Sequence, residues 1–110
     1  MSAETFAYRG PQELLPTIEQ ALRRVVDPEL AMNIVDVGLV VDVSLTGRQL
    51  RVQVTMTSAA CPVAEVILED VEQQLARALP AGLHSEVELV WEPPWTPERL
   101  SAHARRFMGW

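Results

Sequence analysis

The sequence predicts a small mixed α/β domain of the α+β kind, with a three-stranded sheet and about three helices. Three segments alternate apolar and polar residues as half-buried strands do, and others repeat apolar residues at helical spacing. A chain of 110 residues, 48% of them hydrophobic, has the length of one domain and can bury a core without disulfides. We therefore expect a single domain over residues 11–110, preceded by a flexible N-terminal arm over residues 1–10, from which Phe6 and Tyr8 could still dock on the domain.

The first helix is expected to begin at Pro11 or Pro16 and to end near Val25. Its apolar residues recur at helical spacing: Leu14, Ile18, Leu22 and Val25. The helix should end before Pro28, because a residue that precedes proline is biased away from the α region. Residues 29–36 are then expected to be a connection.

Two alternating segments, residues 39–45 and 50–56, are expected to form the first two strands. One face of the first strand would carry Leu39, Val41, Val43 and Leu45, and one face of the second Leu50, Val52, Val54 and Met56. The short link between them contains Gly47, so the pair is predicted to be an antiparallel hairpin.

The second helix, residues 62–79, has the clearest pattern in the chain. Its expected apolar stripe consists of Val63, Val66, Ile67, Val71, Leu75, Ala78 and Leu79. A third strand follows over residues 84–91, with Val87, Leu89 and Trp91 facing inward.

The last helix is expected to begin at Thr96, since threonine favours the N-cap and Pro97 suits the first helical position. Leu100, Ala104 and Phe107 would form its buried side.

This order of elements predicts which segments meet at one edge of the sheet. A strand, a helix and a strand in succession most simply give two parallel strands joined by a right-handed crossover. The start of the first strand and the ends of the other two then share an edge. That edge would collect Asp36, Thr57, Cys61 and the Trp91–Trp95 segment, and the turn at Asp27–Glu29 can reach it.

Cys61 is the candidate for chemistry, because it is the only cysteine in the chain and stands where a strand gives way to a helix. With Pro62 as the first helical residue, Cys61 would be the N-cap. Free backbone N–H groups and the positive end of the helix dipole favour a thiolate there, the form that attacks electrophiles and binds metals. The alternative is a small buried hydrophobe, as unpaired cysteines often are.

The other candidate residues also have alternative interpretations. Asp36, Asp27, Glu29 and Thr57 could support the chemistry at Cys61 or only satisfy turns and strand ends. Trp91 and Trp95 could belong to the core or contact a partner, because tryptophan is enriched at the centres of interfaces.

Two further function classes stay open at this point. In a thiol enzyme Cys61 would need a nearby base. His84 starts the third strand at the opposite edge, and His103 lies about two turns into the last helix. In a non-catalytic interaction module, the Trp91–Trp95 edge would bind a partner and Cys61 would have no role.

The amino-acid composition makes some classes of partner unsuitable and favours one cellular compartment. The net charge is −6 and all nine basic residues are arginines without a basic stripe, so nucleic acid and membranes are poor partners. A lone cysteine cannot form an internal disulfide, and neither a signal-peptide pattern nor a membrane-spanning apolar run is found. We therefore expect a cytoplasmic protein.

Four motifs resemble the PaaD/SufT-like iron–sulfur, or metal–sulfur, cluster assembly family, to which the MIP-type cytosolic iron–sulfur targeting factor is similar. The matching segments are Asp27-Pro28-Glu29, residues 33–40, residues 57–62 and residues 92–97. The resemblance implies a domain like the carboxy-terminal domain of NifU scaffolds and a role in maturing iron–sulfur proteins. The chain lacks the carboxy-terminal cysteine cluster of longer PaaD proteins, which weakens an assignment to phenylacetate degradation.

The resemblance also implies site residues, cargo and partners. The family's cysteine corresponds to Cys61, its D-P-E motif to residues 27–29, its aspartate to Asp36 and its threonine to Thr57. Because an iron–sulfur cluster usually takes four thiolates, one Cys61 per chain predicts transient ligation of iron or a cluster, and none retained in air. The expected partners are assembly proteins and client apoproteins, with a homodimer as one source of further ligands. The expected role is that of an accessory factor, not an enzyme.

Overall fold

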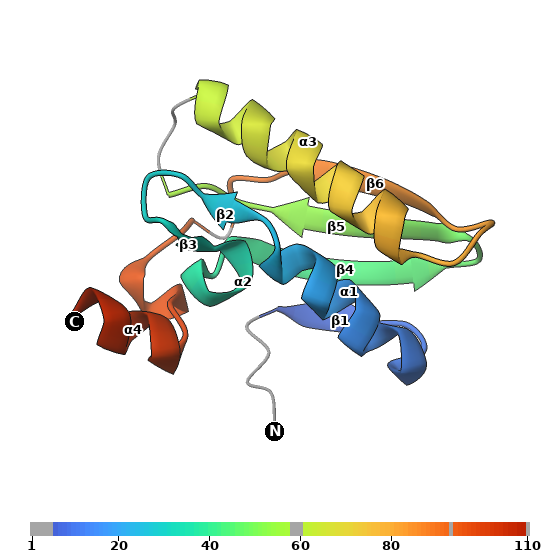
Figure 1. The fold of residues 1–110 in the computed structure, drawn as a ribbon, viewed down its shortest axis with the longest axis horizontal. Coiled ribbons are helices and arrows are strands. Elements are labelled where there is room, and N and C mark those ends of the chain that lie inside the picture. The colour runs from blue at the N-terminus through green and yellow to red at the C-terminus, as the bar shows by residue number, and fades with distance from the viewer. Residues whose placement is uncertain (1–5, 58–60, 93, 110) are drawn as a thin grey trace.

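The computed structural model describes residues 6–57, 61–92 and 94–109, and it is a mixed α+β fold (Figure 1). A four-stranded sheet has the order β1-β4-β5-β6, one strand more than expected, and β2 and β3 form a separate two-stranded ribbon. In chain order the elements are β1 (Ala7–Arg9), the 3-10 helix η1 (Gln12–Leu14), α1 (Leu15–Arg23), β2 (Val26–Asp27), β3 (Met32–Asn33), α2 (Ile34–Val37), β4 (Val40–Thr46), β5 (Gln49–Val54), α3 (Cys61–Ala78), β6 (His84–Leu89), the 3-10 helix η2 (Pro97–Arg99) and α4 (Ala102–Met108).

The central topology confirms the sequence prediction. β4 and β5 pair antiparallel, with Val43 opposite Val52, around a two-residue loop that Gly47 opens at φ 62°. β5 and β6 pair parallel with α3 as the crossover between them, and Val52 lies beside Val87. The end of β5, the end of β6 and the start of β4 therefore share one edge.

The expectation of a flexible arm over residues 1–10 was wrong from residue 6 onward. Ala7–Arg9 form β1, which pairs parallel with β4 and sets Tyr8 beside Val43. Phe6 is buried in the core, and Tyr8 packs against it. The segment is ordered because it supplies backbone partners to the side of β4 that faces away from β5, and its aromatic residues gain burial.

The core lies between one face of the sheet and the two long helices, α1 and α3, which pack on each other (Figure 1). β5 contributes alternate residues to it, as expected. The buried hydrophobic residues of the two helices are Ile18, Ala21, Leu22, Ala64, Ile67, Val71 and Leu75. No helix in the described part of the chain is long and apolar enough to cross a membrane.

Three residues expected in the core are exposed. Val66 is 58% exposed because the buried stripe of α3 runs through Ile67, about 100° around the helix from it. Trp91 is 51% exposed because β6 ends two residues earlier, at Leu89. Phe107 is 65% exposed because α4 is short and buries Ala104 in its first turn.

Residues 29–36, expected to be a connection, contain β3 and the start of α2. Asn33 caps α2: its Oδ1 accepts a hydrogen bond from the backbone N–H of Asp36 at 2.9 Å. The helix ends at Gly38, whose φ is 86°. The C-terminal helix is also divided, because Leu100 is extended between η2 and α4. Ser101, not Thr96, makes the side-chain cap of α4.

Candidate functional site at the sheet edge

Cys61 is the first residue of α3, which begins beyond the end of β5. The prediction that it precedes the helix was wrong by one residue, and Pro62 is the second helical residue, where its missing N–H still costs no hydrogen bond. The rest of the predicted loop, residues 58–60, lies outside the described residues. That the Cys61 thiol is present as a thiolate stays a prediction.

The turn at Asp27 lies beside this helix, since β2 packs against α3. Asp27 is only 1% exposed. Its Oδ1 accepts a hydrogen bond from the backbone N–H of Glu29 at 2.8 Å, and its carbonyl oxygen accepts one from Ala31 N at 2.7 Å. Ala31 completes the turn at φ 55°. The geometry makes Asp27 the residue that fixes this turn, while Glu29 is exposed on it.

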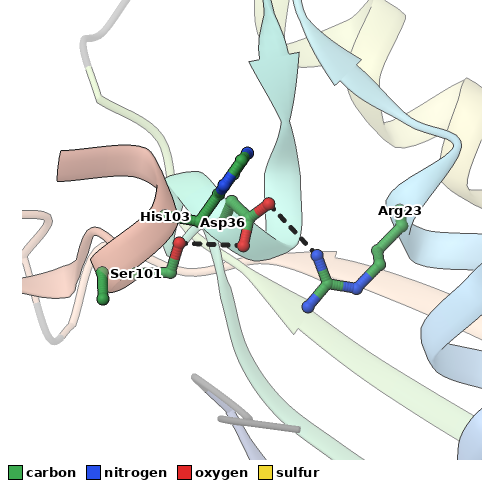
Figure 2. Close-up of a pocket in the computed structure, with 5 residues that line it drawn as sticks. Arg23, Asp36, Ser101 and His103 are labelled. Carbon is green, nitrogen blue, oxygen red and sulfur yellow. Dashed lines mark hydrogen bonds and ion pairs between the residues drawn. The ribbon is translucent and has the colours of Figure 1, made fainter. Parts of the chain in front are cut away.

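Asp36 is buried in a network of hydrogen bonds beside a pocket of about 350 Å³ (Figure 2). Its Oδ2 accepts from Asn33 Nδ2 at 2.8 Å and from Arg23 Nη1 at 3.1 Å. Its Oδ1 accepts from Ser101 Oγ at 2.8 Å. Burial raises the pKa of the Asp36 carboxyl, but the hydrogen bonds from Asn33 and Ser101 and the charge of Arg23 outweigh it, so the pKa lies below its usual value.

This network joins three helices that are distant in sequence. Arg23 comes from α1, Asp36 from α2, and Ser101 from the start of α4 (Figure 2). Ser101 N also donates to the carbonyl oxygen of Asp36 at 2.8 Å. Sequence reasoning missed Arg23, Asn33 and Ser101, although the last two carried a signal, since both are residue types that favour N-caps.

The two tryptophans, predicted to be core residues or partner contacts, differ in exposure. The Trp95 indole N–H donates to the carbonyl oxygen of Val37 at 2.7 Å, and the side chain packs against the core. Trp95 therefore holds the C-terminal segment in place. Trp91 is half exposed just beyond β6, so it is the more accessible of the pair.

Arg99 strengthens the same attachment and was not predicted. Its Nε donates to Gly38 O at 2.8 Å and its Nη2 to Val40 O at 3.2 Å. Desolvation by burial lowers the pKa of Arg99, yet arginine stays charged at neutral pH. The guanidinium group of Arg99 therefore donates its hydrogen bonds to backbone carbonyl groups at the junction of α2 and β4.

The threonines at the end of β5 differ in burial. Thr55 is fully buried and its Oγ1 has no hydrogen-bond partner, while its backbone N–H donates to Leu39 O at 2.8 Å. Thr57, the predicted supporting residue, is half buried in a bend.

Metal-binding residues and bases are sparse around this edge. Within residues 6–57, 61–92 and 94–109, no group of three or more histidine, cysteine, aspartate or glutamate residues could hold a metal ion. His84 lies at the opposite edge of the sheet, beside Gln49, as predicted. His103 lines the pocket with Asp36 (Figure 2).

Residues 16–89 match the model of a family described as iron–sulfur cluster assembly protein. The chain belongs to this family. It is 41% identical over 99 residues to the Fe-S protein maturation auxiliary factor YitW of Bacillus subtilis, covering 89% of this chain and 96% of that protein. It is 38% identical over 86 residues to the Fe-S protein maturation auxiliary factor SufT of Staphylococcus aureus, covering 77% of this chain and 97% of that protein. The recognition from four motifs is confirmed.

Solved structures confirm the fold. A domain of unknown function (DUF59) from Bacillus anthracis superposes with a TM-score of 0.81 at 37% identity, over 89% of this chain and 93% of that one. A conserved hypothetical protein from Thermotoga maritima gives a TM-score of 0.71 at 36% identity, over 93% and 97% of the two chains.

Proposed function

We propose that this protein acts in the maturation of iron–sulfur proteins as an accessory factor, in which Cys61 contacts iron, a cluster or a client thiol. The observation that carries the proposal is the position of Cys61: the single cysteine opens α3 at the sheet edge, beside the element that ends in the Asp27 turn. The relatives named as Fe-S protein maturation auxiliary factors support the same role.

The chemistry follows from one cysteine in the first turn of a helix. Free N–H groups and the helix dipole favour a thiolate at such a position. A closed iron–sulfur site usually needs four thiolates, so a contact through one cysteine releases its cargo easily. The remaining ligands would come from the donor, the client, a small thiol or a second copy of the chain.

In this mechanism Asp36 has a structural role and does not bind the metal. Its carboxylate already accepts hydrogen bonds from Arg23, Asn33 and Ser101, and binding a metal would leave these donors unpaired. Asp27 likewise serves its own turn. Two of the acidic residues that the resemblance implies as helpers of Cys61 therefore stabilise the fold instead: Asp27 fixes the turn after β2, and Asp36 joins α2 to α1 and to the start of α4.

Anaerobic reconstitution with iron and sulfide tests the role of Cys61. We expect wild-type protein to bind iron or a cluster, read by absorbance and native mass, and Cys61→Ser to lose that binding with an unchanged circular-dichroism spectrum. In cells that depend on this protein, Cys61→Ser should also lower the activity of iron–sulfur enzymes. Unchanged client activity with Cys61→Ser would overturn the proposal.

A second candidate, an interaction module that does not use Cys61, is favoured by the exposure of Trp91, just beyond β6, and of Val66, in the second turn of α3. Trp91→Ala distinguishes the two candidates without disturbing the bond from Trp95 to Val37. If Trp91→Ala abolishes client maturation while Cys61→Ala leaves it intact, the interaction module is correct. If both variants lose maturation, the partner binds through Trp91 and the chemistry occurs at Cys61.

A further inference from the structure

β6 is an outer strand of the sheet, and among the described residues it pairs only with β5 (Figure 1). The backbone N–H groups of His84 and Val90 both donate toward the β5 side, at 2.8 Å. Backbone groups in a strand point alternately to one neighbour and to the other. The N–H and C=O groups of Ser85, Val87 and Leu89 therefore point to the free edge.

Among the described residues, the protection that this edge carries against strand addition is the negative charge of Glu86 and Glu88, which a basic partner would neutralise. Short length, proline, charged residues (lysine above all) and bulges protect exposed edges. The opposite edge strand, β1, is protected by its length of three residues. β6 has six residues with neither proline nor lysine, and its register with β5 runs without a bulge. Its inward-facing Val87 and Leu89 pack against the core but are only half buried.

The outward-facing side of β6 is acidic. Glu86 and Glu88 are both exposed. Glu86 lies 3.6 Å from Arg51, but both side chains are 56% exposed, and such a surface pair contributes little. Glu88 accepts a hydrogen bond from Gln53, which carries no charge. The strand therefore offers an apolar row on one side, carboxylates on the other, and unpaired backbone groups between them.

We propose that β6 binds an extended segment of a partner protein in which apolar and basic residues alternate, added to the sheet as a further strand. The backbone of that segment would pair with Ser85, Val87 and Leu89. Its apolar side chains would cover Val87 and Leu89 beside α3, and its basic side chains would lie beside the two glutamates. Backbone pairing supplies affinity and the alternating pockets supply specificity.

A second copy of this chain is a poor occupant of the same edge. Antiparallel pairing of two β6 strands about Val87 would set Glu86 of each strand opposite Glu88 of the other. Like charges directly opposite one another destabilise a strand pair. The two glutamates therefore discourage self-association and favour a basic partner.

A short peptide that alternates lysine with valine tests the proposal on the full-length protein. We expect it to bind and to shift the amide resonances of Ser85, Val87 and Leu89. N-methylation of the peptide along the edge that pairs with β6 should weaken binding about tenfold or more, the effect of losing one good hydrogen bond. The same peptide methylated along its other edge is the control and should bind unchanged.

Protein variants test the same contact from the other side. Val87→Pro removes a donor from the free edge but none from the β5–β6 pairing, and should lower peptide affinity about tenfold or more. Replacing both glutamates, Glu86→Gln with Glu88→Gln, should weaken binding and reduce its salt dependence. Glu69→Gln combined with Glu72→Gln, which removes two exposed carboxylates from α3, is the matched charge control.

Three results would overturn the proposal: equal affinity for the two methylated peptides, amide shifts confined to residues outside β6, or a dimer of the free chain that Val87→Pro dissociates. The proposal does not depend on Cys61. Cys61→Ser should bind the peptide like wild type, so failure here and failure of the proposed function are separate results.

Discussion

At the scale of single residues, Thr55 departs most clearly from the chemistry of its surroundings. It continues β5 on the side opposite the core-facing Val54, yet it is fully buried and its hydroxyl has no hydrogen-bond partner. A buried hydroxyl without a partner costs about 1–3 kcal/mol of folding free energy. Valine has nearly the shape of threonine without the hydroxyl, so it would fill the same buried position without an unpaired polar atom.

We predict that Thr55→Val raises the free energy of unfolding by about 1 kcal/mol, because valine keeps the shape and removes the unpaired hydroxyl. Urea denaturation measures the change. Thr57→Val is the control: Thr57 is half exposed, so its substitution should change stability by less than about 0.5 kcal/mol. A loss of stability in Thr55→Val would show that the hydroxyl has a partner, such as a buried water.

At the scale of elements, the junction of α2 and β4 decides how the C-terminal segment is attached. Gly38 ends α2 with φ 86°, and a Cβ there would lie 2.2 Å from Arg99 O. Arg99 in turn donates to the carbonyl oxygen of Gly38. The glycine is therefore required both for its backbone conformation and for the close approach of η2.

Comparing two glycines separates these requirements. We predict that Gly38→Ala destabilises the fold by more than Gly47→Ala, measured by thermal or urea unfolding. Both have positive φ, which costs alanine about 1–2 kcal/mol, but nothing lies within 4 Å of a Cβ at Gly47. The difference between the variants reports the clash with Arg99. Equal losses would mean that η2 moves away without cost.

Element patterns in the sequence were a reliable guide wherever a segment was long enough to show a period. The β4–β5 hairpin, the crossover helix α3 and the parallel strand β6 were all predicted, and with them the edge at which Cys61 lies. Short elements were missed. α2 has four residues, too few for a helical period, although Asn33 and Asp36 have the spacing of a capped first turn.

The candidate site was predictable in position but not in its contacts. Topology alone brought Asp36, Cys61 and the Trp91–Trp95 segment to one edge. The carboxylate of Asp36 accepts hydrogen bonds from Arg23 and Ser101. These two residues are 78 residues apart and approach each other only in the tertiary structure. Pairing across such a distance leaves no periodic signal in a single sequence.

At the scale of the whole molecule, the C-terminal segment is attached to the domain mainly by polar contacts. Among the side chains that the structure describes between residues 94 and 109, the buried hydrophobic ones are Leu100 and Ala104, with Trp95 partly buried against the core. The hydrogen bonds of Asp36, Arg99 and Trp95 supply the rest of the attachment. The sheet with α1 and α3 has a continuous apolar core, so the segment should separate from the domain before the sheet unfolds.

Acid should reveal this order, because Asp36 lies at the centre of the attachment. Its pKa is lower in the folded protein than in the unfolded chain, so its contribution to stability is complete above the ordinary aspartate pKa of about 3.9. The contribution is lost as the pH falls through the lower, folded value and the carboxylate takes up a proton. We predict that, as the pH falls below the ordinary aspartate pKa, the amides of α4 lose hydrogen-exchange protection before those of β5.

The matched variant Asp36→Asn should show weakened α4 protection already at neutral pH, with little further change on acidification, because its amide cannot hold the charge of Arg23. Ser101→Ala should give an intermediate result, since it removes one hydrogen bond and the cap of α4. If wild-type α4 and β5 instead lose protection at the same pH, the polar contacts at Asp36 and the apolar core form one cooperative unit. The C-terminal segment would then be an integral part of the domain that carries Cys61.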